Sequence, residues 1–154
     1  MTVTSVTGSA FLADTTILIR DKLRENISDP ISGERPFTEK FVLTEYPQRS
    51  VTYPIITVVD RGVSQPKRLG MGSEGTVLNI TLEIRIWARN VKERDELFDN
   101  VYNYLKNNQL DDATGLVAAN LHGFTMTSAI NVNESGQAGI KSKIMEVKFL
   151  FINE

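Results

Sequence analysis

TVLNITLEIRIWA, residues Thr76 to Ala88, decides the fold of this chain. Apolar and polar side chains alternate along it, so that Leu78, Ile80, Leu82, Ile84 and Ile86 share one face and Asn79, Thr81, Glu83 and Arg85 share the other. A period of two is typical of a β-strand, because successive side chains point to opposite faces of the sheet. The segment therefore predicts a half-buried antiparallel strand with an apolar inner face and a polar outer face.

A helix is expected directly after this strand. Asn90 is followed three residues later by Glu93, the spacing of a capping box, in which the Asn side chain accepts from a backbone N–H and the Glu reaches back. Beyond this cap the apolar positions recur with helical spacing, at Leu97, Val101, Tyr104 and Leu105. Charged residues occupy the remaining positions, which indicates one buried and one solvated face.

The segments before Thr76 predict a first helix and two strands. The first helix is expected from about Ala10 to Asn26, with Leu12, Thr16, Ile19 and Leu23 on its buried stripe. An irregular or edge strand is expected within residues 37–46. The β-branched run of residues 51–60 predicts a longer strand, in which Pro54 marks an edge, a bulge or the strand start because it has no N–H to donate.

The C-terminal part predicts a hairpin. Residues 124–132 and 140–152 both alternate, with a turn at 133–139 between them. The inward positions are expected to be Phe124, Met126, Ile130 and Val132 on the first strand, and Met145, Val147, Phe149 and Phe151 on the second. The connector 107–122 is less regular, and a short helix starting near Asp111 is one interpretation of it.

The order helix, strands, helix, strands predicts an α+β fold, an antiparallel or mixed sheet with two main helices packed on one face. Residues 1–9 lack helical period and are expected to form a flexible N-terminal arm. The remainder, residues 10–154, is expected to be a single domain, because a chain of 154 residues is long enough to bury one core.

Composition excludes several classes of function. The formal net charge is −2, which does not favour a protein that grips nucleic acid, and the absence of cysteine excludes thiolate metal sites and cysteine nucleophiles. The N-terminus lacks the basic start and apolar core of a signal peptide. No apolar run approaches the roughly 20 residues that span a bilayer, so no membrane partner is expected.

Three motifs that could carry chemistry have simpler interpretations. The segment Gly70 to Gly75 matches G-x-G-x-x-G, but a strand follows it where a dinucleotide site needs a helix N-terminus. His122 is the only histidine, which leaves zinc without its usual ligands and a catalytic triad without a local nucleophile motif. Asp111 and Asp112 suit a helix start. No catalytic residue, metal site or cofactor is therefore expected.

Two features favour contacts with other molecules. The segment from Arg61 to Gly75 combines glycine, proline and serine with basic residues, and is either a solvated loop or a mobile contact element that orders against a partner or lies near DNA phosphates. Trp87 and Val77 fall on the polar side of the main strand. Trp87 is either an exposed interface anchor or is buried under a loop or second layer.

The strand YPIITVVD (residues 53–60), the glycine-containing segment after it and the run LNITLEIRIWARNVKERDELFDNVYNYL (residues 78–105) together resemble the tail terminator, or tail-completion, proteins of tailed bacteriophages. The resemblance covers residues 11–105 and rests on the element order and on the strand followed by a helix rich in charged residues. It implies a small α+β protomer that assembles as a ring, commonly a hexamer. Such a ring caps the tail tube, ends its polymerisation and joins the tail to the head connector, while DNA passes through the hole.

On this resemblance the chain is expected in the neck of a virion assembled in the host cytoplasm, with the tail tube protein, the head–tail connector protein and, transiently, DNA as partners. Arg61, Gln65, Lys67 and Arg68 are the expected contacts with the tube or DNA, and Glu83, Arg85 and Trp87 the expected protomer interface or lumen. One alternative is a head-completion protein or tail tube subunit of the same virion. Another, of a different class, is a small cytoplasmic enzyme or ligand-binding domain that uses the His122 region.

Overall fold

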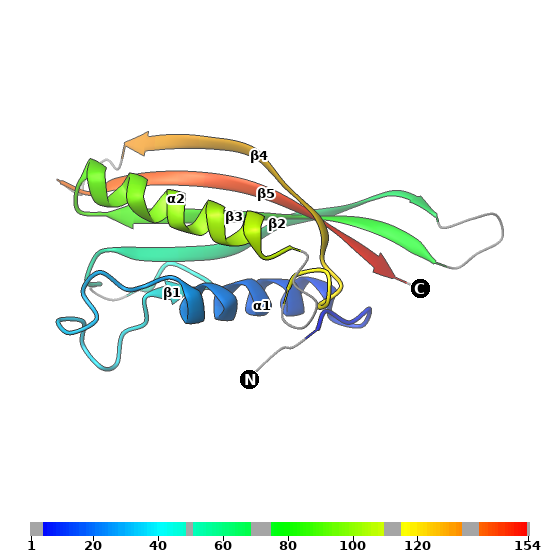
Figure 1. Ribbon diagram of the computed structural model, residues 1–154, viewed down its shortest axis with the longest axis horizontal. Helices are drawn as coiled ribbons and strands as arrows, with labels where there is room; N and C mark the ends of the chain where they lie inside the picture. Colours follow the sequence, from blue (N-terminus) through cyan, green and yellow to red (C-terminus); the bar gives the residue numbers. More distant parts are fainter. Residues whose placement is uncertain (1–4, 49–50, 69–74, 110–114, 134–138, 154) are drawn as a thin grey trace.

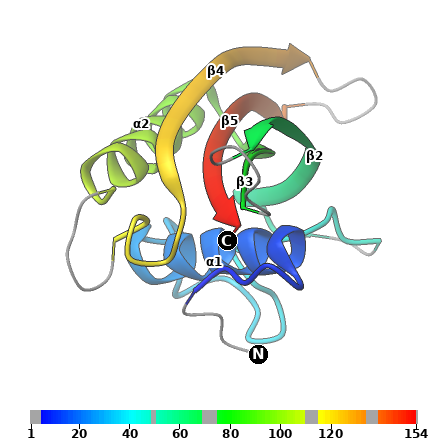
Figure 2. The ribbon, with the colours of Figure 1, turned by 90° about the vertical axis from the view of Figure 1, so that its right-hand side faces the viewer.

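The computed structural model describes residues 5–48, 51–68, 75–109, 115–133 and 139–153. In this part of the chain the elements are α1 (Phe11–Asn26), β1 (Val42–Leu43), β2 (Ile55–Arg68), β3 (Thr76–Ala88), α2 (Val91–Asn107), β4 (His122–Asn133) and β5 (Lys141–Asn153). The strands form one five-stranded sheet in the order β1-β2-β3-β5-β4, in which only the β1–β2 pair is parallel. Both helices lie on the same side of this sheet (Figures 1 and 2). The predicted α+β class, with a mixed sheet, is confirmed.

β3 is the central strand, and its predicted bounds are confirmed at both ends. It pairs antiparallel with β2 on one side and, from Thr76 to Ala88, with β5 on the other. Its inner-face side chains Leu78, Ile80, Leu82, Ile84 and Ile86 are all buried and belong to the core. Backbone hydrogen bonds on both edges and burial on one face explain why the alternating pattern predicted this element so well.

α1 packs with a buried face that is shifted from the predicted one. Thr15, Leu18, Ile19 and Leu23 are its buried residues, whereas Leu12 and Thr16 are only half-buried. The helix can bury Thr15 because the hydroxyl donates a 2.6 Å hydrogen bond to the Phe11 carbonyl, which satisfies its polar group. None of the described helices is long and apolar enough to cross a membrane.

The cap of α2 is partly as predicted. The Asn90 side chain accepts a 2.8 Å hydrogen bond from the backbone N–H of Glu93, as expected of an N-cap residue. The Glu93 carboxylate, however, accepts from the backbone N–H and guanidinium of Arg89 and not from the Asn90 N–H. Leu97, Val101 and Leu105 are buried as predicted, while Tyr104 is half-buried.

A loop was expected between Arg61 and Gly75. This prediction is wrong for the residues up to Arg68, because they continue β2. The strand stays paired with β3 to its end, through register shifts between Asp60 and Gly62 and between Ser64 and Lys67. The first shift uses a glycine with a φ of 139°, and the second contains Pro66. Glycine and proline are thus accommodated at bulges, where a missing side chain or a missing N–H costs little pairing. Residues 69–74 lie outside the described part of the chain.

The C-terminal hairpin is confirmed, with two inward residues of β4 wrong. Met145, Val147, Phe149 and Phe151 of β5 are all buried. In β4, Met126 pairs with Val147 and Ser128 with Glu146, so Thr127 is an extra residue that reverses the alternation after it. Ile130 and Val132 consequently face away from the helices, and Ile130 is 56% exposed.

The remaining segments also differ in part from expectation. β1 is a short edge strand, as predicted for that region, and Pro54 immediately precedes β2. The segment expected to be a free arm is attached at Val6, which is buried in the core and whose N–H donates to the Ala119 carbonyl at 2.9 Å. The expected helix near Asp111 falls partly outside the described residues, and residues 115–120 form turns.

Candidate interaction surface

The side of the sheet opposite the helices is the candidate interaction surface, and we call it the outer face. No described helix covers it, as the end-on view shows (Figure 2). The strand register places on it Thr57 and Val59 of β2, Thr81, Glu83, Arg85 and Trp87 of β3, Ile144, Glu146, Lys148 and Leu150 of β5, and Ile130 of β4. Directly opposed residues of neighbouring strands share a face, so this set forms one continuous surface.

Charged groups gather at the centre of the outer face. Arg61 lies within 3.4 Å of the Glu83 carboxylate, with side chains 57% and 15% exposed respectively. Glu83 stands directly opposite Glu146 on β5, an arrangement of like charges that is unfavourable by itself. The Thr127 hydroxyl, displaced by the β4 bulge, lies 3.3 Å from a Glu146 carboxylate oxygen. Arg61 and Thr127 therefore each stabilise one member of the opposed acidic pair.

An open cleft borders this charged centre. Its lining is polar and of mixed sign, and consists of Arg61, Gly62, Val63, Ser64, Thr81, Glu146 and Lys148. Two cations, a carboxylate and two hydroxyls can engage a polar surface of a partner through charge-assisted hydrogen bonds. Because the lining presents both signs of charge, the cleft suits a partner surface that also carries both signs better than a purely anionic ligand.

Aromatic side chains and an arginine form the other half of the outer face. The Arg85 guanidinium lies 4.0 Å from the centroid of the Trp87 ring and 3.4 Å from the Ser142 hydroxyl. Burial lowers the pKa of Arg85, an effect that the nearby Glu83 carboxylate opposes. The Tyr46 ring covers Trp87 at a centroid distance of 4.8 Å, and the Trp87 indole donates to the Thr57 hydroxyl at 3.4 Å.

Of the two interpretations of Trp87, burial is the one observed. Trp87 is 9% exposed and Val77, at the opposite end of the same face, is 8% exposed. The cover over Trp87 is Tyr46, from the irregular segment between β1 and β2, and the Tyr46 hydroxyl hydrogen bonds to that of Tyr53. The partly exposed group at this end of the surface is therefore Tyr46, which is 38% exposed.

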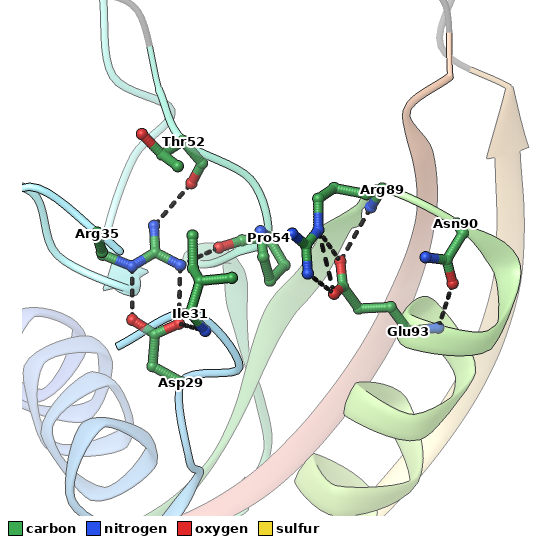
Figure 3. A network of polar contacts seen from close by, with 8 residues as sticks. All are labelled: Asp29, Ile31, Arg35, Thr52, Pro54, Arg89, Asn90 and Glu93. Atoms are coloured by element: carbon green, nitrogen blue, oxygen red, sulfur yellow. Dashed lines mark hydrogen bonds and ion pairs between the residues drawn. The ribbon is translucent and has the colours of Figure 1, made fainter. Parts of the chain in front are cut away.

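A polar clasp anchors the segment that carries Tyr46 and Tyr53 (Figure 3). Arg35 donates to the Thr52 carbonyl at 2.7 Å and to the Pro54 carbonyl at 2.5 Å, while its other donors bind Asp29. The guanidinium also lies 5.3 Å from the centroid of the Phe41 ring. One buried arginine thus ties the loop after α1 to the entry of β2, next to the Trp87 end of the outer face.

The structure brings some of the predicted site residues together and separates others. Arg61 and Glu83 form an ion pair, and Arg85 and Trp87 stack on the same face. Gln65, Lys67 and Arg68 lie towards the far end of β2, where Lys67 pairs with Val77. Their side chains lie outside what the structure describes, so their expected contact with a tube or DNA stays a prediction.

Of the residues weighed as chemical sites, the structure describes His122 and Gly75. The His122 imidazole lies 3.0 Å from the Asn120 side-chain oxygen, at the start of β4. Asp111, Asp112 and residues 70–74 lie outside the described part of the chain, and Gly75 leads directly into a strand. Among the described residues, no group of three or more His, Cys, Asp or Glu side chains is placed to hold a metal ion.

Sequence reasoning missed several members of the outer face. Glu146 and Lys148 could have been found, because they alternate with the correctly predicted inward residues of β5. Tyr46 and Ile130 could not: one depends on the path of an irregular segment and the other on a bulge. No family model matches this chain, and no curated protein matches it.

Proposed function

We propose that this chain is a structural virion protein, a tail terminator that assembles as a ring, commonly a hexamer, on the end of a tail tube. The ring ends tube polymerisation, joins the tail to the head connector and leaves a passage for DNA. The proposal starts from the sequence resemblance of residues 11–105 to that family. It places the chain in the neck of the virion, after assembly in the host cytoplasm, and assigns it a role through contacts and not through catalysis.

The observation that carries the proposal is the outer face, which no described helix covers. A sheet with helices on one side leaves the other side available, and here that side presents the Arg61–Glu83 ion pair, Glu146 and Lys148 within one surface. Ring closure needs a heterologous contact, in which one patch meets a different patch on the neighbouring copy. A face of alternating charge can specify the register of such a contact, because a shifted partner would bring like charges together.

The small excess of positive charge on the same face supports a conduit. Arg61, Arg85 and Lys148 face Glu83 and Glu146, an excess of one positive charge, and the whole chain carries a net charge of −2. DNA-binding surfaces release counterions through many unbalanced basic groups. A face of mixed charge with so small an excess, if it lined the lumen, would hold passing DNA weakly, as transport through the ring requires.

The test is a capping assay with the full chain and tail tubes that lack a terminator, observed by electron microscopy. We expect one ring at one end of each tube and no further growth when tube protein is added. Glu83→Lys should abolish ring formation, since it places a cation beside Arg61. Glu96→Lys, at an α2 side chain that is 64% exposed and away from the outer face, is the matched control.

Each other outcome identifies a rival function or overturns the proposal. Long cylinders formed by the chain alone would identify a tube subunit. Attachment to heads and not to tails would identify a head-completion protein. Absence of binding to tubes at high protein concentration would overturn the assignment to the tail altogether.

A further inference from the structure

The outer edge of β4 is a second surface with the properties of a contact site. β4 ends the sheet order and pairs with β5 on one side, and no described element lies along its other edge (Figures 1 and 2). An edge strand presents unpaired backbone N–H and C=O groups, which are a template for another strand. Whether such an edge pairs with another strand depends on the charges, prolines and bulges that can prevent pairing.

The second half of β4 has none of these protective features. From Ser128 to Asn133 it pairs with β5 residue by residue, without a register shift. Its sequence, SAINVN, contains no charge and no proline, and alternates β-branched with small or amide side chains. Charges, prolines and bulges are the usual means of preventing edge pairing. A regular, uncharged six-residue edge is therefore competent to pair.

The opposite edge of the sheet is protected. β1 covers Ile56 and Thr57 of β2, and beyond them Asp60 and Arg61 place charges on the strand. Register shifts at Arg61 and at residues 65–66, the latter including Pro66, interrupt its ladder. The two edges thus differ in kind, and β4 is the one left open.

We propose that the β4 edge pairs antiparallel with the β4 edge of a second copy of this chain, about a two-fold axis at Asn131. In this register Ile130 of each copy stands opposite Val132 of the other on the outer face. Asn131 stands opposite its own counterpart, where two amides can hydrogen bond. The pairing joins the two sheets into one continuous sheet and covers Ile130, which is 56% exposed in the single chain.

The sequence of this edge favours a second copy of the chain as its pairing partner. Antiparallel pairing of SAINVN with itself opposes β-branched side chains to each other and brings no like charges together. The pairing is isologous and closes at two copies, whereas a ring needs a heterologous contact. It is therefore a contact separate from the proposed ring seam, and does not depend on the proposed function.

Disulfide trapping tests the register, since the chain has no cysteine of its own. Opposed residues of an antiparallel pair lie about 4.5–5.5 Å apart between Cα atoms, within the range that a disulfide spans. Asn131→Cys should give a covalent dimer under mild oxidation. Ser128→Cys is the control, because its counterpart would lie about 20 Å away along the strand and no bond should form.

Light scattering and sedimentation of the unmodified chain give the oligomeric state. We expect a dimer whose dissociation constant rises at least tenfold in Ile130→Lys, which places a charge on the edge. Leu150→Lys, on β5 in the interior of the same face, should leave the dimer intact and so distinguish edge pairing from face-to-face docking. Circular dichroism of both variants confirms that they fold.

A monomer at every concentration, or a cross-link from Ser128→Cys and not from Asn131→Cys, would overturn the proposal. Loss of the dimer in Leu150→Lys would overturn it too. Asn131→Lys places two like charges opposite each other in the paired edges, at a residue that lies off the outer face. It should break the dimer and still cap tail tubes if the proposed function holds, so failure of the two proposals can be told apart. A variant that loses dimers yet caps tubes supports both.

Discussion

Arg35 grips Asp29 with two parallel hydrogen bonds, from Nε to Oδ2 at 2.6 Å and from Nη2 to Oδ1 at 3.0 Å. The Arg35 side chain is 4% exposed and that of Asp29 16% exposed. Paired forks of this kind are geometrically specific and strong. Since Arg35 also binds the carbonyls of Thr52 and Pro54, the pair joins two stretches of irregular chain, the loop after α1 and the segment before β2.

Replacing Arg35 with Met should lower the free energy of unfolding by about 3–5 kcal/mol, the usual cost of removing one partner of a buried ion pair. The reason is that Asp29 and two carbonyls lose their donors at once. Urea unfolding followed by circular dichroism measures the change. Lys92→Ala is the control: its side chain is 85% exposed, its pair with Glu96 is loose, and about 0.5 kcal/mol or less is expected. Equal losses in the two variants would contradict a structural role for the clasp.

The same pair makes stability depend on acid pH. Burial acts to raise the pKa of Asp29, but hydrogen bonds from Arg35 and the Ile31 amide, with the Arg35 charge, outweigh it and hold the pKa below its ordinary value of 3.8. A carboxyl whose folded pKa is depressed contributes stability above its unfolded pKa and loses it as pH falls towards the folded value. Stability should therefore fall from about pH 4 downward.

Asp29→Asn isolates this contribution. The variant should be less stable at pH 7, since the charge on Arg35 loses its partner, and should lose less stability than the natural chain between pH 4 and pH 2. Thermal melting across that range measures both effects. The stability of the variant should still depend on acid pH to some extent, because the pKa of Glu93 is also lowered. Burial acts to raise that pKa, and the hydrogen bonds from Arg89 outweigh it. Parallel pH profiles for the two proteins would refute the assignment to Asp29.

Sequence periodicity predicted the parts of this fold that depend only on residues close together in the sequence. β3, the inner face of β5 and the N-cap Asn90 each depend on local alternation or on a single side chain. Bulges are different, because the position of the extra, unpaired residue depends on how the strand pairs with its neighbour. Nothing in the sequence around Thr127 marks it as the bulged residue of β4. After it, Ile130 and Val132 lie on the opposite face from the one predicted.

The candidate surface was predictable to a similar extent. Glu83, Arg85 and Trp87 were placed on one face by their spacing alone, and the register confirms it. The glycine and proline of β2 suggested a loop around Arg61. In the structure both residues lie at bulges of a strand that stays paired with β3, and amino-acid composition alone does not reveal this pairing. The cover of Trp87 by Tyr46 depends on an irregular segment held by distant contacts, which no periodicity encodes.

Gly123→Ala should destabilise the chain by about 1–2 kcal/mol, the cost of a left-handed backbone for a residue with a Cβ. Gly123 has a φ of 58°, and an added Cβ would lie 3.3 Å from Leu150 Cδ1. Gly33→Ala is the matched control, because nothing lies within 4 Å of a Cβ there. Urea midpoints of the two variants measure the difference, and a Gly123→Ala variant as stable as Gly33→Ala would show that β4 relaxes at this bend.

Trp87 is the only tryptophan, so its fluorescence reports on the aromatic end of the outer face. Tyr46→Ala should shift its emission to longer wavelength, because removing the ring at 4.8 Å admits water to an indole that is 9% exposed. The fold should survive at a cost of about 1–2 kcal/mol, since Tyr46 is itself partly exposed. Phe37→Ala, at a side chain that is 98% exposed, removes an aromatic ring elsewhere and should leave both emission and stability unchanged. An unshifted spectrum in Tyr46→Ala would mean that Arg85, stacked on the same ring, shields Trp87 by itself.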